Sequence, residues 1–326
     1  MARSDLLLNL IRSKTRGDER LFQQTVEAII AEERSKQHHT LANQLIAEMK
    51  VPSAKPRETK DIGFITNSSR LQSLIFETIP QKSLDKMVLN QNIHSACVEL
   101  IEEQIRSDLL KSYNIEPRNR ILLSGPPGNG KTSLAEAVAE ALSIPFITVR
   151  YDGLITSFLG ETNQRLKQIF DYAKTQRCVL FFDEFDTVGK ERGDEHETGE
   201  IKRVVSSLLM QIDSLPSHVI VMAASNHPEL LDRAVWRRFQ VKLELDLPTT
   251  TQIEKILTIF ESRFQLKFGQ SKKSLPKLMT GSSFSDVENF CLDVFRRFIL
   301  EQPSSKMESI IKRQSESFLN TKKIKK

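Results

Sequence analysis

The sequence predicts an α/β fold in which a doubly wound parallel sheet is followed by a smaller helical domain. Between residues 121 and 245, short apolar runs alternate with amphipathic patterns, which is the order of strands and crossover helices in a parallel sheet. A turn rich in Gly and Pro at 125–130 joins one strand directly to a helix. From Pro248 onward, helical patterns follow one another without a strand between them.

Each expected element has its own apolar pattern. The helix after the turn carries Leu134, Ala135, Val138 and Leu142 on one face. The expected strands are 121–124, 145–149, 178–182, 219–226 and 240–245. The other helices of this region are expected at 93–110, 162–174 and 201–212. The apolar residues from Phe64 to Phe76 have no clear period, so we assign no element there.

A chain of 326 residues is long for one domain, so we expect several modules. The first module has short helical stripes that bury little surface alone, so they either form a marginal bundle or pack on a partner, and we expect the module to recognise a partner or a substrate. The last segment is rich in Lys and Arg, and we expect a frayed or solvated tail, with contact to an acidic partner or nucleic acid as the alternative. The expected parts are a helical N-terminal module (1–50), a linker (51–61), a large α/β subdomain (62–247), a helical lid (248–302) and a basic tail (303–326).

Composition and charge limit the possible partners and the compartment. The net charge of +5 is modest and much of it comes from lysines near the C-terminus, which argues against nucleic acid as a partner. The three cysteines lie far apart in apolar surroundings, which predicts buried, reduced thiols in a reducing compartment. No apolar run approaches the roughly 20 residues of a membrane span. We therefore expect a cytoplasmic protein with no membrane contact.

The turn at 125–130 has the spacing of a P-loop, and it lies between a strand and a helix as a P-loop does. Its glycines let backbone N–H groups converge on phosphate oxygens, and the N-terminus of the next helix adds to the attraction. Lys131 is expected to reach the β- and γ-phosphates of ATP, and the Thr132 hydroxyl to ligate Mg²⁺. The residues expected to hold the nucleotide are Gly125, Pro126, Pro127, Gly128, Asn129, Gly130, Lys131, Thr132, Ser133 and Asp183.

Polar residues at the ends of two later strands complete the predicted chemistry. Asp183 follows an apolar strand in the Walker B arrangement and is expected to hold Mg²⁺ together with Thr132. Glu184 beside it can polarise a water for in-line attack on the γ-phosphate. Asn226 is either a strand-end turn residue or a group that orients that water or contacts the γ-phosphate. From the residues alone, the paired arginines Arg237 and Arg238 are interpreted as solvated.

These motifs together resemble those of an AAA ATPase, in the clade that includes FtsH, katanin and spastin. The resemblance covers about Ser83 to Leu300 and includes the P-loop, the Walker B segment 181–186 and a sensor 1 segment at 224–226. Residues 231–239 resemble the stretch that carries arginine fingers, which implies that Arg237 and Arg238 reach the γ-phosphate of a neighbouring subunit. Residues 281–286 align with the family's Gly-Tyr-Ser-Gly-Ala-Asp, with Phe284 and Ser285 in place of Gly and Ala.

The resemblance also implies a pore loop. Phe158, Leu159 and Gly160 are similar to the aromatic, apolar and Gly residues that grip a polypeptide in the central channel of the family's hexamers. The residues alone favour ordinary core packing for Phe158. The polar segment 189–200 stands where the family has its second pore loop.

The leading functional hypothesis is therefore ATP-driven remodelling or unfolding of a protein substrate by a homo-oligomeric ring, a hexamer, with ATP and Mg²⁺ bound. One alternative is a nucleotide switch that regulates a partner enzyme, such as a separately encoded protease. Another is a DNA-linked ATPase, a loader or transposition helper, which the pore-like loop and the missing zinc and helix-turn-helix signatures disfavour. Stimulation of ATP hydrolysis by unfolded protein, by one folded partner or by DNA distinguishes the three.

Overall fold

The computed structural model describes residues 74–150, 159–189, 198–302 and 306–324, together with Thr25 and Ala28. The chain divides into two compact units, Met1–Asp61 and Ile62–Lys326. Apart from Thr25 and Ala28, the predicted N-terminal module and linker lie outside the described residues. In the described part of the chain, no helix has both the length and the apolar character needed to cross a bilayer.

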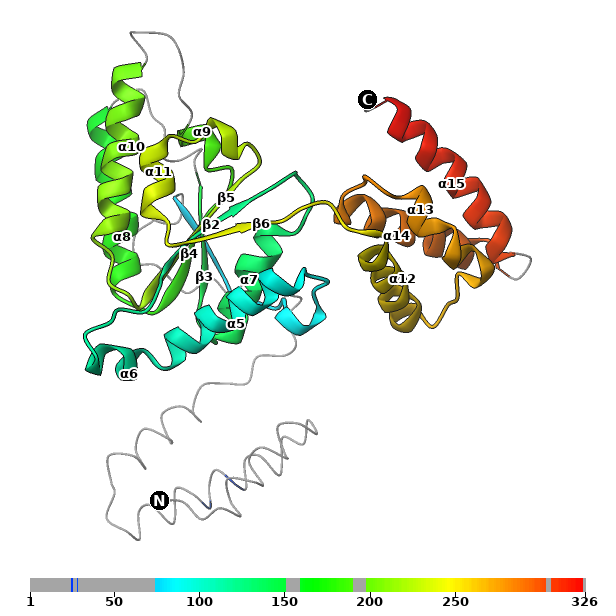
Figure 1. The fold of residues 1–326 in the computed structure, drawn as a ribbon, viewed down its shortest axis with the longest axis horizontal. Coiled ribbons are helices and arrows are strands. Elements are labelled where there is room, and N and C mark those ends of the chain that lie inside the picture. Colours follow the sequence, from blue (N-terminus) through cyan, green and yellow to red (C-terminus); the bar gives the residue numbers. More distant parts are fainter. Residues whose placement is uncertain are drawn as a thin grey trace. The chain divides into compact units, whose positions relative to one another are not determined.

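The described residues of the larger unit form a six-stranded sheet with the strand order β1-β3-β4-β5-β2-β6 (Figure 1). The strands are β1 (Ile75–Thr78), β2 (Arg120–Ser124), β3 (Phe146–Val149), β4 (Cys178–Phe182), β5 (Val219–Ser225) and β6 (Val241–Glu244). All neighbours pair in parallel except β1, which is antiparallel to β3. Because β5 lies between β4 and β2, the carboxyl ends of these three strands are adjacent at one edge of the sheet.

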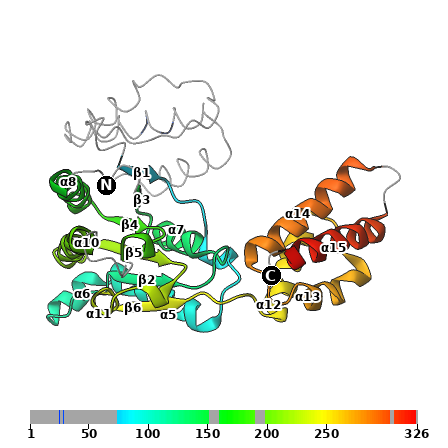
Figure 2. The same cartoon turned by 90° about the horizontal axis from the view of Figure 1, so that it is seen from above.

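Helices cover both faces of the sheet, as a doubly wound fold requires. The helices of this region are α5 (Gln91–Ile105), α6 (Ser107–Ser112), α7 (Lys131–Ala141), α8 (Leu159–Lys174), α9 (Asp186–Gly189), α10 (Thr198–Asp213) and α11 (Arg233–Arg238). Leu122 shares a core cluster with α8, α10 and α11, whereas Ile121 and Leu123 on the opposite face share one with α5 and α7. Both views show α8 and α10 on one side of the strands and α7 on the other (Figures 1 and 2).

The structure confirms the predicted α/β class and differs from the expected elements in three details. β1 occupies a segment to which the sequence assigned no element; it is a short edge strand in which Ile75 is buried and Phe76 is 39% exposed. The helix expected at 93–110 is two helices, because Arg106 leaves the helical conformation at φ −97° and ψ 28°. In addition, α8 begins at Leu159 and α10 at Thr198, both earlier than expected.

The lid is a cluster of helices with an aromatic core. Its elements are α12 (Thr250–Phe264), a 3-10 helix (Gly269–Lys273), α13 (Leu275–Leu278), α14 (Phe284–Leu300) and α15 (Met307–Ile324). Capping boxes at Thr249 and Ser283 begin α12 and α14. The ring of Phe295 lies 5.0 Å from that of Phe264 and 5.1 Å from that of Phe268, between ring centroids.

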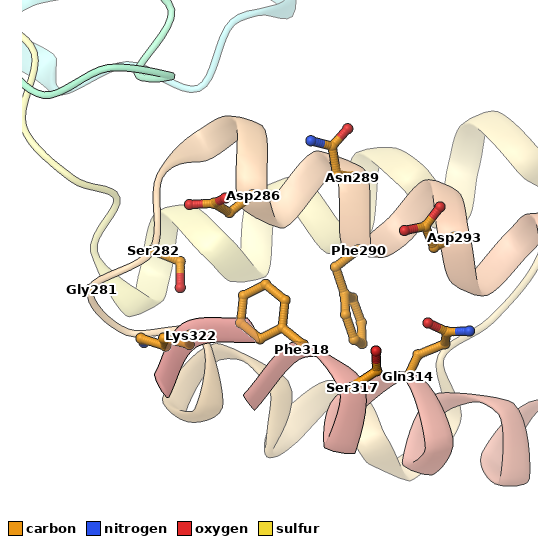
Figure 3. Close-up of a pocket in the computed structure, with 10 residues that line it drawn as sticks. All are labelled: Gly281, Ser282, Asp286, Asn289, Phe290, Asp293, Gln314, Ser317, Phe318 and Lys322. Atoms are coloured by element: carbon orange, nitrogen blue, oxygen red, sulfur yellow. The ribbon is translucent and has the colours of Figure 1, made fainter. Parts of the chain in front are cut away.

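The expectation of a frayed or solvated tail is wrong for most of the last segment. Residues 307–324 form α15, in which Ile310 and Ile311 are buried in the lid core. Phe318 packs edge-on against Phe290 with centroids 5.6 Å apart, and Figure 3 shows the two rings between α14 and α15. The apolar stripe is short and its neighbours are mostly charged, so composition concealed the helix.

Candidate functional site

Three glycines in unusual backbone conformations shape the turn between β2 and α7. The φ angles of Gly125, Gly128 and Gly130 are 131°, 77° and 83°, which other residues rarely adopt. A Cβ atom at Gly125 would lie 2.3 Å from the carbonyl oxygen of Leu245, so the turn also needs glycine there for space. Pro126, Pro127 and Gly128 are exposed. This geometry fits the predicted phosphate cradle, in which backbone N–H groups face the ligand.

Lys131, the first residue of α7, lies over the turn. Its Nζ donates hydrogen bonds to the carbonyl oxygens of Gly125 at 2.7 Å and Pro126 at 3.0 Å. Burial lowers the pKa of Lys131, and the carboxylates of Asp183 and Asp186 oppose this effect. A partly desolvated cation beside two carboxylates fits a site for a polyphosphate and its divalent cation. The ammonium complements the negative polyphosphate, and the carboxylates complement the divalent cation.

Thr132 and Asp183 are brought together from the start of a helix and the end of a strand. Thr132 lies in the first turn of α7 and Asp183 follows β4, and Thr132 Oγ1 donates to Asp183 Oδ2 at 3.1 Å. A hydroxyl and a carboxylate are the hard oxygen ligands that Mg²⁺ prefers when phosphates and waters supply the rest. Among the described residues, no three His, Cys, Asp or Glu side chains cluster as a metal site. The donor set therefore fits Mg²⁺ bound together with a nucleotide.

Glu184 has a strained backbone. Its φ is 47°, the left-handed region that favours glycine, and its side chain is exposed. The N–H of the next residue, Phe185, donates to Ala224 O at 2.7 Å, and the fully buried Phe185 ring packs edge-on against Phe182 and Phe239. These contacts hold the turn in its strained form and direct Glu184 away from the core.

Asp186 is a site residue to which the sequence analysis gave no role. Its Oδ1 accepts a hydrogen bond from Ser225 Oγ at 2.9 Å and another from the backbone N–H of Asn226 at 3.2 Å. Asp186 thereby joins the end of β4 to the end of β5 and fixes the position of Asn226. The sequence does contain a signal for Asp186, because it follows the acidic pair of Asp183 and Glu184 by two residues. Its hydrogen-bond partners, Ser225 and Asn226, are far away in the chain and are found only in the folded structure.

The two predicted arginine fingers have different surroundings. Arg238 donates from Nε to Asp213 Oδ2 at 2.9 Å and from Nη1 to Ala234 O at 3.0 Å. Asp213 also pairs with Arg120 at 2.8 Å, which ties α11 to the start of β2. Arg237 is exposed and has no ion-pair partner among the residues that the structure describes. Of the two, Arg237 is therefore the one whose charge is available to another molecule.

The predicted pore loop is only partly described. Phe158 lies outside the described residues, as do residues 190–197 of the predicted second loop. Leu159 and Gly160 belong to the first turn of α8, so the backbone there is helical and not a loop as expected.

The unusual Phe284 belongs to the lid core. Its ring packs against the buried lid cluster, and its backbone N–H donates to Asn129 Oδ1 at 3.3 Å. In addition, the N–H of Ser285 donates to Gly128 O at 3.0 Å. The first turn of α14 therefore meets the P-loop directly through its backbone.

Comparisons with known proteins connect the chain with one family. The model of the ATPase family associated with various cellular activities (AAA) matches residues 121–247. The AAA family ATPase y4kL of Sinorhizobium fredii is 33% identical over 307 residues, which is 93% of this chain and 91% of the relative. The chain spans much less of other relatives. The peroxisomal ATPase PEX6 of Arthrobotrys oligospora is 33% identical over 72% of this chain, but the match covers only 21% of that relative. A cell division cycle protein 48 homolog of Archaeoglobus fulgidus is 36% identical over 59% of this chain, and the match covers 27% of that relative.

Two findings identify the family: the near full-length match to one family member and the family model over residues 121–247. The chain belongs to the AAA family of ATPases, and its enzymatic activity is the hydrolysis of ATP.

Proposed function

We propose that this protein couples ATP hydrolysis to the remodelling or unfolding of a protein substrate, as a hexameric ring in the cytoplasm. The observation that carries the proposal is the grouping of Thr132, Asp183, Glu184 and Asn226 at the carboxyl ends of adjacent strands, with an exposed Arg237 nearby in the chain. Such an edge of an open α/β sheet is where ligands bind. The similarity of Phe158, Leu159 and Gly160 to the family's polypeptide-gripping pore loop favours a protein substrate over DNA.

In the proposed site, the backbone of the turn and Lys131 hold the phosphates, while Thr132 and Asp183 hold Mg²⁺. When bound, the Mg²⁺ neutralises charge on the phosphate oxygens. The ammonium of Lys131 already lies over the turn, so little movement separates it from a phosphate in the cradle. Gly128 and Gly130 have positive φ angles and no side chain, which lets the backbone of the turn approach the phosphates closely.

Glu184 is proposed as the general base. Its carboxylate takes a proton from a water whose oxygen bonds to the γ-phosphorus, as the bond from that phosphorus to the bridging oxygen of ADP breaks. Asn226 orients the water, and Asp186 positions Asn226 through the backbone N–H. The strain at Glu184 supports this role, since backbone strain is retained mainly where function needs it.

Arg237 is proposed to complete the site of a neighbouring subunit. Its exposure leaves its guanidinium available, whereas Arg238 is held within its own subunit by Asp213. An arginine supplied in trans can raise the rate by about 10³ to 10⁵. Arg237→Ala protein is therefore expected to fold and bind ATP but to be inactive. Arg238→Ala protein, in contrast, is expected to be less stable than the wild type, because Asp213 loses a partner.

Mixing experiments test the ring. Lys131→Ala subunits cannot use their own site but still supply Arg237, so mixing them with Arg237→Ala subunits is expected to restore part of the ATPase activity. Phosphate release measured over a range of mixing ratios reports the rescue. No rescue at any ratio, together with monomeric elution from a sizing column in ATP, would instead support a solitary nucleotide switch.

The substrate role depends on Phe158. Phe158→Ala is expected to keep nucleotide binding, oligomerisation and thermal stability but to lose ATPase stimulation by unfolded protein, while Phe158→Tyr keeps part of it. If Phe158 is a core residue instead, the alanine variant loses about 3–5 kcal/mol of stability. If one folded partner or DNA stimulates the ATPase activity, and Phe158→Ala protein responds as the wild type does, substrate threading is contradicted.

A further inference from the structure

Asn129 lies at the point where the lid and the P-loop meet. It is flanked by Gly128 and Gly130, both in left-handed conformations, and its side chain is buried, with the residue 4% exposed. A buried amide needs partners for both its oxygen and its nitrogen, since an unpaired polar group is costly in the interior. The partners of this one lie in the segment that leads into the lid and at the start of α14 within the lid.

The two ends of the amide bind different segments. Nδ2 donates to the carbonyl oxygen of Leu245 at 3.2 Å, just before the chain passes into α12. Oδ1 accepts from the backbone N–H of Phe284, the first residue of α14, at 3.3 Å. The donor faces a carbonyl and the acceptor faces an N–H, so the orientation of the amide is fixed by its surroundings.

The neighbouring backbone strengthens this contact. Gly128 O accepts from the N–H of Ser285 at 3.0 Å, and a Cβ atom at Gly128 would lie 2.9 Å from Ser283 Oγ. The first N–H groups of a helix have no partner within the helix, and here the P-loop satisfies two of them. The lid therefore approaches the turn closely and binds it through hydrogen bonds at Gly128 and Asn129.

We propose that Asn129 is a positioning residue that ties the lid to the P-loop and so retains bound nucleotide. This inference rests on the proposed role of the turn as the nucleotide site. Asn129 acts through the lid and not on the reacting atoms, so its loss changes how long the nucleotide stays bound and leaves the bond-breaking step unaffected. The physical basis is that opening the lid requires breaking the Asn129–Phe284 and Gly128–Ser285 hydrogen bonds.

The test uses the full chain and the fluorescent nucleotide mant-ADP. Asn129→Ala is expected to release mant-ADP about tenfold faster and to raise KM for ATP by a similar factor, with kcat within about threefold of the wild type. Hydrogen exchange at the amides of Phe284 and Ser285 is expected to accelerate. Asn129→Ser, which keeps a hydroxyl, is expected to be intermediate and serves if the alanine variant is too unstable.

Asn119→Ala is the matched control. Asn119 is equally buried, at 5% exposed, and its Nδ2 donates to Pro216 O at 3.2 Å and Val219 O at 2.9 Å, at the amino end of β2. This variant is expected to lose stability with no change in mant-ADP release. Wild-type release from Asn129→Ala, or equally fast release from both variants, would overturn the proposal. Failure of wild-type protein to bind mant-ADP would overturn the nucleotide site itself, which is a distinguishable result.

Discussion

The carboxyl edge of the sheet and the core of the lid are built in different ways. At the edge, a lysine lies partly desolvated beside carboxylates, and Glu184 has a left-handed backbone. In the lid, phenylalanine rings pack around Phe295, and the helices α12 and α14 begin with complete capping boxes. The edge therefore contains a desolvated charge and a strained backbone, which lower the stability of the fold, whereas the lid contains packing and capping contacts that raise it.

This difference indicates where each region contributes. Strain and desolvated charge lower stability, so they persist where they serve chemistry. Aromatic packing and capping raise stability and specify no reaction by themselves. Substitutions at the edge are therefore expected to reduce turnover with little effect on the melting temperature, and substitutions in the lid core to do the reverse. Three substitutions test whether the edge governs turnover and the lid core governs stability, with each expected effect given in kcal/mol.

The largest effect is expected for Phe295→Ala in the lid. Phe295 is 1% exposed and contacts three other aromatic rings, so its truncation leaves a cavity. We expect a loss of about 3–5 kcal/mol in the free energy of unfolding and a lower Tm in calorimetry, with ATPase activity retained well below the transition. Loss of activity at an unchanged Tm would show that the lid core takes part in catalysis directly.

The next effect is expected for Glu184→Gln at the edge. Removal of the base should slow hydrolysis at least about 10²-fold, or about 2.7 kcal/mol in the barrier, while ATP still binds. Single-turnover phosphate release and equilibrium binding measure the two quantities separately. Lys131→Ala provides the contrast, because it is expected to weaken binding itself. Wild-type turnover by Glu184→Gln would exclude Glu184 as the base.

The smallest effect is expected for Asp186→Ala. Its loss frees Ser225 Oγ and the N–H of Asn226 from their acceptor, so Asn226 is positioned less well. We expect kcat to fall about tenfold, or about 1.4 kcal/mol, with KM nearly unchanged. Asp171→Ala, which removes an exposed carboxylate from α8, is the control and should leave kcat unchanged. Equal effects of the two substitutions would mean that Asp186 has no positioning role.

The sequence predicted the parallel strands well because each is an apolar run between clear breaks. It contained no signal for β1, because an edge strand with one exposed face has too few apolar residues to show a period. The pattern also missed α15, where Ile310 and Ile311 are buried among charged neighbours. Both omissions involve elements whose burial depends on a distant segment, which a local pattern does not encode.

For the candidate site, the sequence was most informative where chemistry and spacing coincide, as in Gly125 to Thr132. It could not show that Asp186 binds the residues after β5 or that Asn129 reaches α14, because the contacting positions are 40 and 155 residues apart in the chain. Nor could it distinguish Arg237 from Arg238, since their difference arises from the position of Asp213.

The burial of all three cysteines has a practical consequence. Cys97, Cys178 and Cys291 are free thiols, and burial raises the pKa of each to about 12, so none is a ready nucleophile in the native protein. Maleimide dyes need an accessible thiolate, so a cysteine introduced on the surface can be labelled selectively without first removing the native ones. One such reporter on α12 and another on α7 would allow lid movement to be followed by energy transfer during turnover.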